Sequence, residues 1–209
     1  MIRLLLAEDH ALVRDGLRLL ISTQPDMTLL ADTDDGNDVI ALTRLHCPDI
    51  LLLDLGLPNL DGIAIMAALS AERLPTRVLV VTARLSPASV RASLELGAAG
   101  YLPKSEDSDE LLAAVRRVAA GHQYVSPEVA QLCAAENADA EAAELAALTD
   151  RERVVLAHVG AGLSSKEIAR ILGISDLTVR KHRENLCRKL GSRNAAELIA
   201  TAVRNGLGG

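Results

Sequence analysis

The chain has 209 residues, 49% of them hydrophobic, and a formal net charge of −6 at pH 7. This length allows one or two domains, and because Phe and Trp are absent, the cores must be built from aliphatic side chains. No apolar stretch reaches the roughly 18 residues of a membrane span, no signal-peptide pattern opens the sequence, and three widely spaced cysteines indicate free thiols rather than a disulfide framework or a metal cluster. We therefore expect a cytoplasmic protein that does not bind a membrane.

The first 121 residues alternate between strand and helix patterns. Aliphatic runs predict five strands, near 2–6, 27–32, 49–53, 77–82 and 99–102. Helical patterns follow each of them, near 11–23, 36–46, 61–72, 86–96 and 106–120. Strict alternation of this kind indicates an α/β fold with a doubly wound, five-stranded parallel sheet. Gly121 is predicted to end the last helix.

Polar residues follow four of the predicted strands. The acid pair Glu8 and Asp9 follows the first, Asp54 the third, and Lys104 the fifth, while Thr82 ends the fourth. Because ligands of open parallel sheets bind outside the carboxyl ends of the strands, we expect these side chains to converge. Clustered carboxylates suit Mg²⁺, and a lysine and a hydroxyl suit phosphoryl oxygens. Since aspartate can act as a nucleophile, the pattern predicts a phosphoryl-transfer site.

Four motifs, in their order and spacing, make residues 1–120 resemble the receiver domain of bacterial two-component response regulators. They are AEDH at 7–10, LD at 53–54 with Pro58 and Gly62, VTA at 81–83, and GAAGYLPK at 97–104. The family's sheet has the flavodoxin-like strand order.

The resemblance implies a phosphoacceptor and a metal site. Asp54 would accept a phosphoryl group from a histidine of a sensor kinase. Asp9, Asp54 and the carbonyl of Gly56 would bind Mg²⁺, with Glu8 in support. His10 is interpreted as the start of the first helix rather than as a ligand, because Mg²⁺ prefers oxygen.

The resemblance also implies how the phosphoryl group is held and sensed. Thr82 and Lys104 would bind its oxygens, and Tyr101 stands where the family has a ring that changes orientation when the threonine moves. The domain would assist its own phosphoryl transfer and slow autodephosphorylation without being an enzyme.

Charge divides the chain into an acidic and a basic part. Residues 1–130 contain 11 Lys and Arg against 18 Asp and Glu, residues 131–147 contain four acids and no base, and residues 148–209 contain 11 bases against 6 acids. This division indicates that only the last part meets a polyanion. Residues 122–147, which include an Ala/Glu-rich stretch, are interpreted as a partly helical linker. A flexible tether and a continuous helix are the alternatives.

From residue 148 onward the pattern is helical, which predicts a second, smaller all-α domain at 148–209. The segments 149–152 and 164–167 are capping boxes, and Ser175 is predicted to cap a longer helix that runs to about Leu190. A short helix, a tight turn and a longer helix make a helix-turn-helix.

The longer helix has two different faces. The inward face is predicted to consist of Val179, His182 or Arg183, Leu186 and Leu190, which follow three- and four-residue steps. The opposite side carries Arg180, Lys181, Glu184 and Arg188. Such a surface can enter a major groove, while Lys166 and the capped helix ends suit phosphates. The alternative is an ordinary solvated helix face. Single-strand binding by stacking is not expected, because this region has no aromatic residue.

Five motifs here are similar to the LuxR-type helix-turn-helix. They are LTDRE at 148–152, GLSSKEIA at 162–169, IS at 174–175, TVRKH at 178–182 and KLG at 189–191. Joined to a receiver, this domain makes the whole chain resemble the NarL/FixJ family of response regulators.

This second resemblance implies contact with double-stranded promoter DNA and a homodimer. The residues expected at DNA are Lys166, Thr178, Arg180, Lys181, Glu184 and Arg188. Glu184 departs from the family, which usually has a neutral or basic residue there; it is either repelled by phosphate or accepts from a cytosine amino group. The final helix, about 194–205, would support dimerisation through Ala195, Leu198, Ile199 and Ala202, unless these complete the domain's own core.

The favoured function is a transcriptional regulator controlled by phosphorylation of Asp54. One alternative is a phosphohydrolase with the same aspartyl chemistry, although such enzymes carry a second aspartate where this chain has Gly56. Another is a DNA binder whose receiver serves only for docking or dimerisation.

Overall fold

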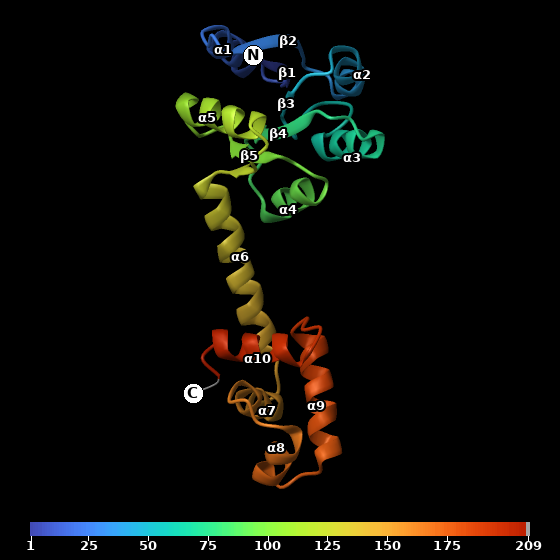
Figure 1. Cartoon of the computed structure of the whole chain (residues 1–209), viewed down its shortest axis with the longest axis vertical. Coiled ribbons are helices and arrows are strands. Elements are labelled where there is room, and N and C mark those ends of the chain that lie inside the picture. Colours follow the sequence, from blue (N-terminus) through green and yellow to red (C-terminus); the bar gives the residue numbers. More distant parts are fainter. Residues whose placement is uncertain (208–209) are drawn as a thin grey trace. The chain divides into compact units, whose positions relative to one another are not determined.

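The computed structural model describes residues 1–207, apart from the side chain of Asn137. Residues 208 and 209, the end of the predicted C-terminal domain, lie outside the described residues. The chain divides into two compact units, Met1–Ala134 and a second unit that begins at Ala135 (Figure 1).

The N-terminal unit is built on one sheet of six parallel strands in the order β2-β1-β3-β4-β5-β6. The strands are β1 (Ile2–Ala7), β2 (Met27–Thr33), β3 (Ile50–Leu53), β4 (Arg77–Thr82), β5 (Gly100–Pro103) and β6 (Tyr124–Val125). The predicted doubly wound parallel sheet is confirmed, with six strands where the sequence predicts five.

Helices cover both faces of the sheet. They are α1 (Ala11–Ser22), α2 (Gly36–His46), α3 (Gly62–Glu72), α4 (Pro87–Glu95) and α5 (Ser108–Ala119). Figure 1 shows α1 and α5 on one side and α2, α3 and α4 on the other. Successive side chains of β3 therefore alternate between two cores: Ile50 and Leu52 pack with α1 and α5, and Leu51 and Leu53 pack on the opposite face. Burial on both faces explains why the strand is an unbroken aliphatic run.

The sixth strand lies in the segment that the sequence assigns to a linker. Gly100 gives it room, because a Cβ there would lie 2.8 Å from the Tyr124 carbonyl oxygen. The following helix, α6 (Pro127–Ala146), buries Val129 completely in the core beneath α2, α3 and α4, and Cys133 packs against that core. The beginning of this segment is thus part of the N-terminal unit. A two-residue strand is too short to show a period in the sequence.

The C-terminal unit is helical, as predicted. Its helices after α6 are α7 (Asp150–Gly160), α8 (Ser165–Leu172), α9 (Asp176–Lys189) and α10 (Ala195–Arg204). Both predicted capping boxes form, at Thr149 with Glu152 and at Ser164 with Glu167. Gly173 ends α8 with a φ of +64°, which glycine adopts without steric cost, and a helix-turn-helix results.

Aliphatic side chains from all four of these helices form the core of the C-terminal unit. Val155, Ile168, Val179, Leu186 and Leu198 are fully buried in it. No helix within residues 1–207 is both long and apolar enough to cross a membrane.

Candidate functional site

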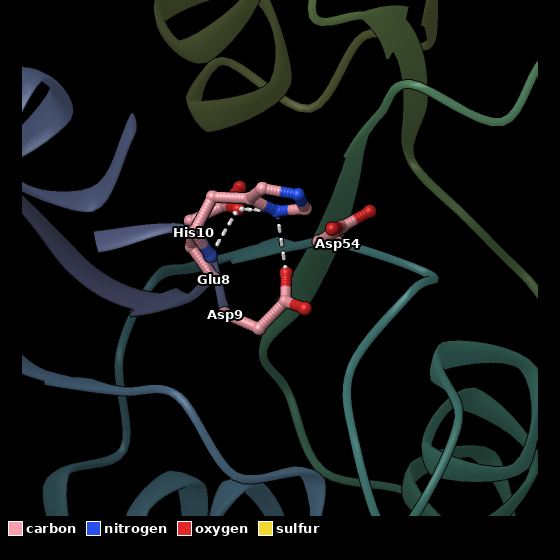
Figure 2. A group of neighbouring side chains, drawn as sticks. All are labelled: Glu8, Asp9, His10 and Asp54. Carbon is pink, nitrogen blue, oxygen red and sulfur yellow. Dashed lines mark hydrogen bonds and ion pairs between the residues drawn. The ribbon is translucent and has the colours of Figure 1, made fainter. Parts of the chain in front are cut away.

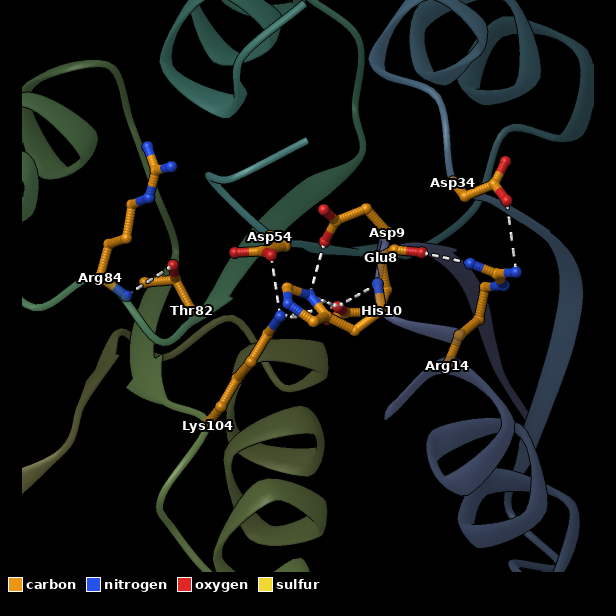
Figure 3. Close-up of polar contacts among 9 residues, drawn as sticks. All are labelled: Glu8, Asp9, His10, Arg14, Asp34, Asp54, Thr82, Arg84 and Lys104. Carbon is orange, nitrogen blue, oxygen red and sulfur yellow. Dashed lines mark hydrogen bonds and ion pairs between the residues drawn. The ribbon is translucent and has the colours of Figure 1, made fainter. Parts of the chain in front are cut away.

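Four neighbouring strands deliver polar side chains to one edge of the sheet (Figure 3). Glu8 follows β1, Asp54 follows β3, Thr82 ends β4 and Lys104 follows β5. The register pairs Ala7 with Leu53, so the residues that follow these two strands leave the sheet at the same level. Glu8, Asp54 and Thr82 are buried, and only 13% of the Lys104 side chain is exposed.

Lys104 joins two of the carboxylates directly. Its Nζ lies 2.6 Å from Glu8 Oε2 and 2.8 Å from Asp54 Oδ2. Burial alone would favour neutral lysine, but hydrogen bonds to Asp54 and Glu8 outweigh it and raise the pKa of Lys104. The lysine is therefore a cation held between two anions.

Asp54 is ionised and incompletely satisfied. Burial opposes its charge, but the Lys104 ammonium, with the Gly56 N–H and the Thr82 hydroxyl nearby, lowers its pKa below the ordinary value. Its Oδ1 atom is buried and has no hydrogen-bond partner among the described residues. An unpaired carboxylate oxygen at this depth is costly unless a cation or another donor reaches it.

Glu8, Asp9, His10 and Asp54 form a compact donor cluster (Figure 2). One ligand atom from each lies within 4.8 Å of those of the others. Three carboxylates and the unsatisfied Asp54 oxygen fit the requirements of a hard divalent cation such as Mg²⁺. Glu8, Asp9 and Asp54, with the Gly56 carbonyl that the family resemblance implies, are the residues that would hold it.

His10 begins the first helix, as predicted, since it is the N-cap residue of α1. Its ring does not cap that helix. The Nδ1 atom lies instead 2.7 Å from Asp9 Oδ1 and 3.1 Å from Glu8 Oε1. The His10 ring is thus within hydrogen-bond distance of both acids.

The sequence did not predict the contacts that two arginines make with residues of this site. Arg14 of α1 donates from Nη1 to the Glu8 carbonyl oxygen at 2.7 Å and lies 3.3 Å from Asp34, which holds the β1–α1 loop in place (Figure 3). The backbone N–H of Arg84 donates to Thr82 Oγ1 at 3.1 Å. A Cβ on Gly56 would lie 3.4 Å from Asp54 Oδ2 and 3.8 Å from Arg84 Nε, so Arg84 borders the same space as Asp54. An arginine in a loop or helix carries no sequence signal for such contacts.

Tyr101 lies beneath this edge of the sheet. It is fully buried, and its hydroxyl donates to the Arg84 carbonyl oxygen at 3.1 Å. Burial first, then the charges of Asp54 and Cys133, raise the pKa of Tyr101 to about 12. Because Val129 and Cys133 of α6 belong to the same core as Tyr101, the ring lies between the loop after Thr82 and the first turns of α6.

The second candidate site is the outer face of α9. Val179 and Leu186 are fully buried and Leu190 is 8% exposed, so the predicted inward face is confirmed. The residues predicted to face outward, together with Lys166 of α8, are exposed: Lys166, Thr178, Arg180, Lys181, Glu184 and Arg188. A cationic helix face that is free of core contacts is suited to the major groove of DNA.

Contacts within α9 restrain some of these side chains. Arg180 Nη2 lies 3.0 Å from Asp176 Oδ2, one turn earlier, and Arg188 donates to Asn185 at 3.1 Å. The Thr178 hydroxyl lies 2.8 Å from the Ser175 hydroxyl at the helix N-cap. Asp176 as a partner of Arg180 was missed, although an acid and a base four residues apart are a recognisable helical pair.

The residues predicted to support dimerisation divide into two groups. Leu198 and Ala202 are fully buried in the core of the C-terminal unit, so their side chains are not accessible to a second chain. Ile199 is half-buried and Ala195 exposed. The exposed side of α10 carries in addition Ala196, Ala200 and Val203.

Two family models match the chain, one over each unit. "Response regulator receiver domain" matches residues 4–116, and "Bacterial regulatory proteins, luxR family" matches residues 146–202.

Curated relatives match nearly the whole chain. It is 35% identical to the "Probable transcriptional regulatory protein NarL" of Mycobacterium tuberculosis, over 99% of this chain and 95% of the relative. It is also 35% identical to the "Transcriptional regulatory protein UhpA" of Salmonella typhimurium, over 95% and 96%. A crystal structure of a two-component response regulator of the LuxR family from Aurantimonas matches with a TM-score of 0.63 and 34% identity, over 66% of this chain and 99% of that one.

Proposed function

The chain belongs to the NarL/FixJ family of two-component response regulators, which join a receiver domain to a LuxR-type helix-turn-helix and regulate transcription, and from this premise we propose that Asp54 is its phosphoacceptor. The observation that carries the proposal is the placement of Asp54: it is buried and ionised, with Lys104 2.8 Å from one oxygen and no partner among the described residues for the other.

In the proposed reaction, a carboxylate oxygen of Asp54 attacks the phosphorus of a phosphohistidine on a sensor kinase. The P–O bond forms as the P–N bond breaks, and the electron pair leaves with the imidazole nitrogen. Glu8, Asp9, Asp54 and the Gly56 carbonyl would hold a divalent cation, whose charge would offset the repulsion between the carboxylates and the incoming group. Lys104 moves from the carboxylate to a phosphoryl oxygen, and Thr82 donates to another. Slow hydrolysis of the aspartyl phosphate at the same site resets the protein.

Phosphorylation replaces the single negative charge of the Asp54 carboxylate with about −1.5 to −2 charges on an acyl phosphate, and so makes the edge of the sheet more negative. Lys104 and Thr82 are drawn toward the new group, and because the Tyr101 hydroxyl binds the loop just after Thr82, its ring follows. This change controls whether two chains dimerise and bind DNA. We place the protein in the cytoplasm, where both kinase and promoter are accessible.

The DNA-binding part of the proposal rests on the outer face of α9. Arg180, Lys181 and Glu184 would face the major groove with Thr178 and Arg188, and Lys166 would contact the phosphate backbone. Ala195 and Ile199 on α10 are the accessible members of the predicted dimer contact.

Phosphorylation is tested by incubating the full chain with a small phosphoryl donor and Mg²⁺ and measuring its intact mass. We expect an adduct of about 80 Da, the mass of one phosphoryl group, on the wild-type chain and none on Asp54→Asn, which keeps nearly the same shape but has no nucleophilic oxygen pair. Removing Mg²⁺ with a chelator, or substituting Asp9→Ala, should slow formation of the adduct.

Any other outcome would favour a different acceptor residue or one of the alternative functions. An equal adduct on Asp54→Asn would place the acceptor elsewhere. Rapid turnover of donor without an adduct would indicate a phosphohydrolase, and no reaction at all would leave a receiver used only for docking or dimerisation.

A further inference from the structure

Leu177, the second residue of α9, is 77% exposed. A single exposed leucine says little by itself, because folded proteins expose much apolar surface. Its position on the helix is more informative.

Leu177 belongs to the same face as the residues proposed to contact DNA. Leu177, Lys181, Glu184 and Arg188 follow one another at steps of four, three and four residues, which places them in one stripe along a helix. All four are exposed, whereas Val179 and Leu186 on the opposite side are fully buried. Leu177 therefore extends the outer face by one turn, to the end of the helix that usually contacts base edges in helix-turn-helix proteins.

Without Leu177, this stripe of residues would contain only charged side chains. Lysine and arginine suit guanine or phosphate, and glutamate suits the cytosine amino group, but none of these groups matches the methyl group that distinguishes thymine in the major groove. Leu177 is the apolar member of the stripe. The polar residues next to Leu177 in the sequence have partners of their own, Asp176 with Arg180 and Thr178 with Ser175.

We propose that Leu177 is a specificity-determining residue that contacts the C5-methyl group of a thymine in each half-site. This inference rests on the proposed binding of α9 in the major groove and adds the base that its N-terminal end selects.

The test uses the full chain, with Mg²⁺ and a phosphoryl mimic present throughout, and duplexes that differ by one methyl group. Preferred duplexes are first selected from a random pool with the wild-type chain, and each thymine is then replaced in turn by deoxyuridine, which lacks only the C5-methyl group. Affinities are measured at one salt concentration for wild type, Leu177→Ala, Leu177→Met and Leu12→Ala. Leu12 on α1 is a matched control, since it is also an exposed leucine, at 87%, but lies outside the helix-turn-helix.

At one thymine of each half-site, deoxyuridine should weaken wild-type binding about fourfold, the equivalent of one buried methyl group. Leu177→Ala should bind the thymine duplex more weakly and lose nothing further with deoxyuridine. Leu177→Met, which keeps an apolar side chain, should retain the sensitivity, and Leu12→Ala should behave like wild type.

Two results would overturn the inference while leaving DNA binding intact: tight wild-type binding that no deoxyuridine affects, or a Leu177→Ala chain that remains as sensitive as wild type. If the wild-type chain binds no duplex at all, the proposed DNA contact fails together with the inference, and the two failures are thereby distinguished.

Discussion

At the scale of single residues, the proposed reaction gives Lys104 two successive roles. Between Glu8 and Asp54 it offsets the repulsion of two buried acids, each of which is costly to bury without a partner. The same ammonium is within reach of a group placed on Asp54. In the proposed reaction one cation serves both purposes, so the arrival of a phosphoryl group would redistribute the contacts of Glu8. The Arg14 contact to the Glu8 carbonyl would keep the backbone fixed during this change.

Glu152 provides a test of a residue-scale contribution to stability. Hydrogen bonds from Lys189 and from Thr149 lower its pKa to about 2 from an ordinary 4.5, although burial opposes this. A lowered pKa means that the contribution to stability is complete above pH 4.5 and is lost as the pH falls toward 2. We expect Glu152→Gln to lower the free energy of unfolding of the C-terminal unit at pH 7 by about 1–3 kcal/mol and to flatten its pH dependence between 4.5 and 2.

Denaturation with urea at several pH values, followed by far-ultraviolet circular dichroism, measures this effect. Glu184→Gln is the control, because that glutamate is exposed on α9. If Glu152→Gln keeps the wild-type slope in the acid range, the contacts with Lys189 and Thr149 do not contribute as described.

At the scale of elements, α6 begins as part of the N-terminal unit. Val129 is fully buried there, so Val129→Ala should cost about 2 kcal/mol through two lost methyl groups and the cavity that remains. Tyrosine fluorescence is a selective probe, because the two tyrosines, Tyr101 and Tyr124, both belong to this unit. Glu144→Ala, at an exposed position farther along the helix, is the control. An unchanged tyrosine transition in Val129→Ala would show that α6 does not stabilise the sheet.

The helix α9 allows a sharp test at Glu184. If phosphate merely repels this residue, Glu184→Lys should raise the affinity for every duplex, and if it accepts from a cytosine amino group, the substitution should change the preferred site at a cost of about 1–3 kcal/mol on the original one. Lys181→Ala serves as the reference for a lost cation. If neither Lys181→Ala nor Arg180→Ala changes affinity or preference, this face of α9 does not read DNA.

At the scale of the whole molecule, the proposed function requires that the acidic N-terminal unit control DNA binding by the basic C-terminal unit. A phosphoryl mimic on the wild-type chain should change its oligomeric state in sedimentation and increase its affinity for a selected duplex, whereas Asp54→Asn should not respond. The logarithm of the binding constant should fall linearly with the logarithm of the salt concentration, with a slope of about −1 per phosphate contact. Identical sedimentation and binding with and without the mimic would show that the receiver does not control DNA binding.

The sequence by itself determined those features of the protein that local or periodic patterns encode. Alternating aliphatic runs and helical faces predict the sheet and its helices, because burial on one or both faces imposes a period on neighbouring residues. Polar residues after strands predict the cluster of Glu8, Asp54 and Lys104, since parallel strands all end at the same edge. Capping boxes and Gly173 predict the helix-turn-helix because their chemistry lies within a few residues.

Only the tertiary structure decided features that depend on contacts between distant segments. The two residues of β6 are too few to show a period, and the burial of Val129 depends on a core built by other helices. The contact of Arg14 with the Glu8 carbonyl and that of Tyr101 with the Arg84 carbonyl have no signature in local sequence. The same limit of the sequence applies to Leu198 and Ala202. Their spacing marks an apolar face, but only packing shows that this face is used by the domain's own core.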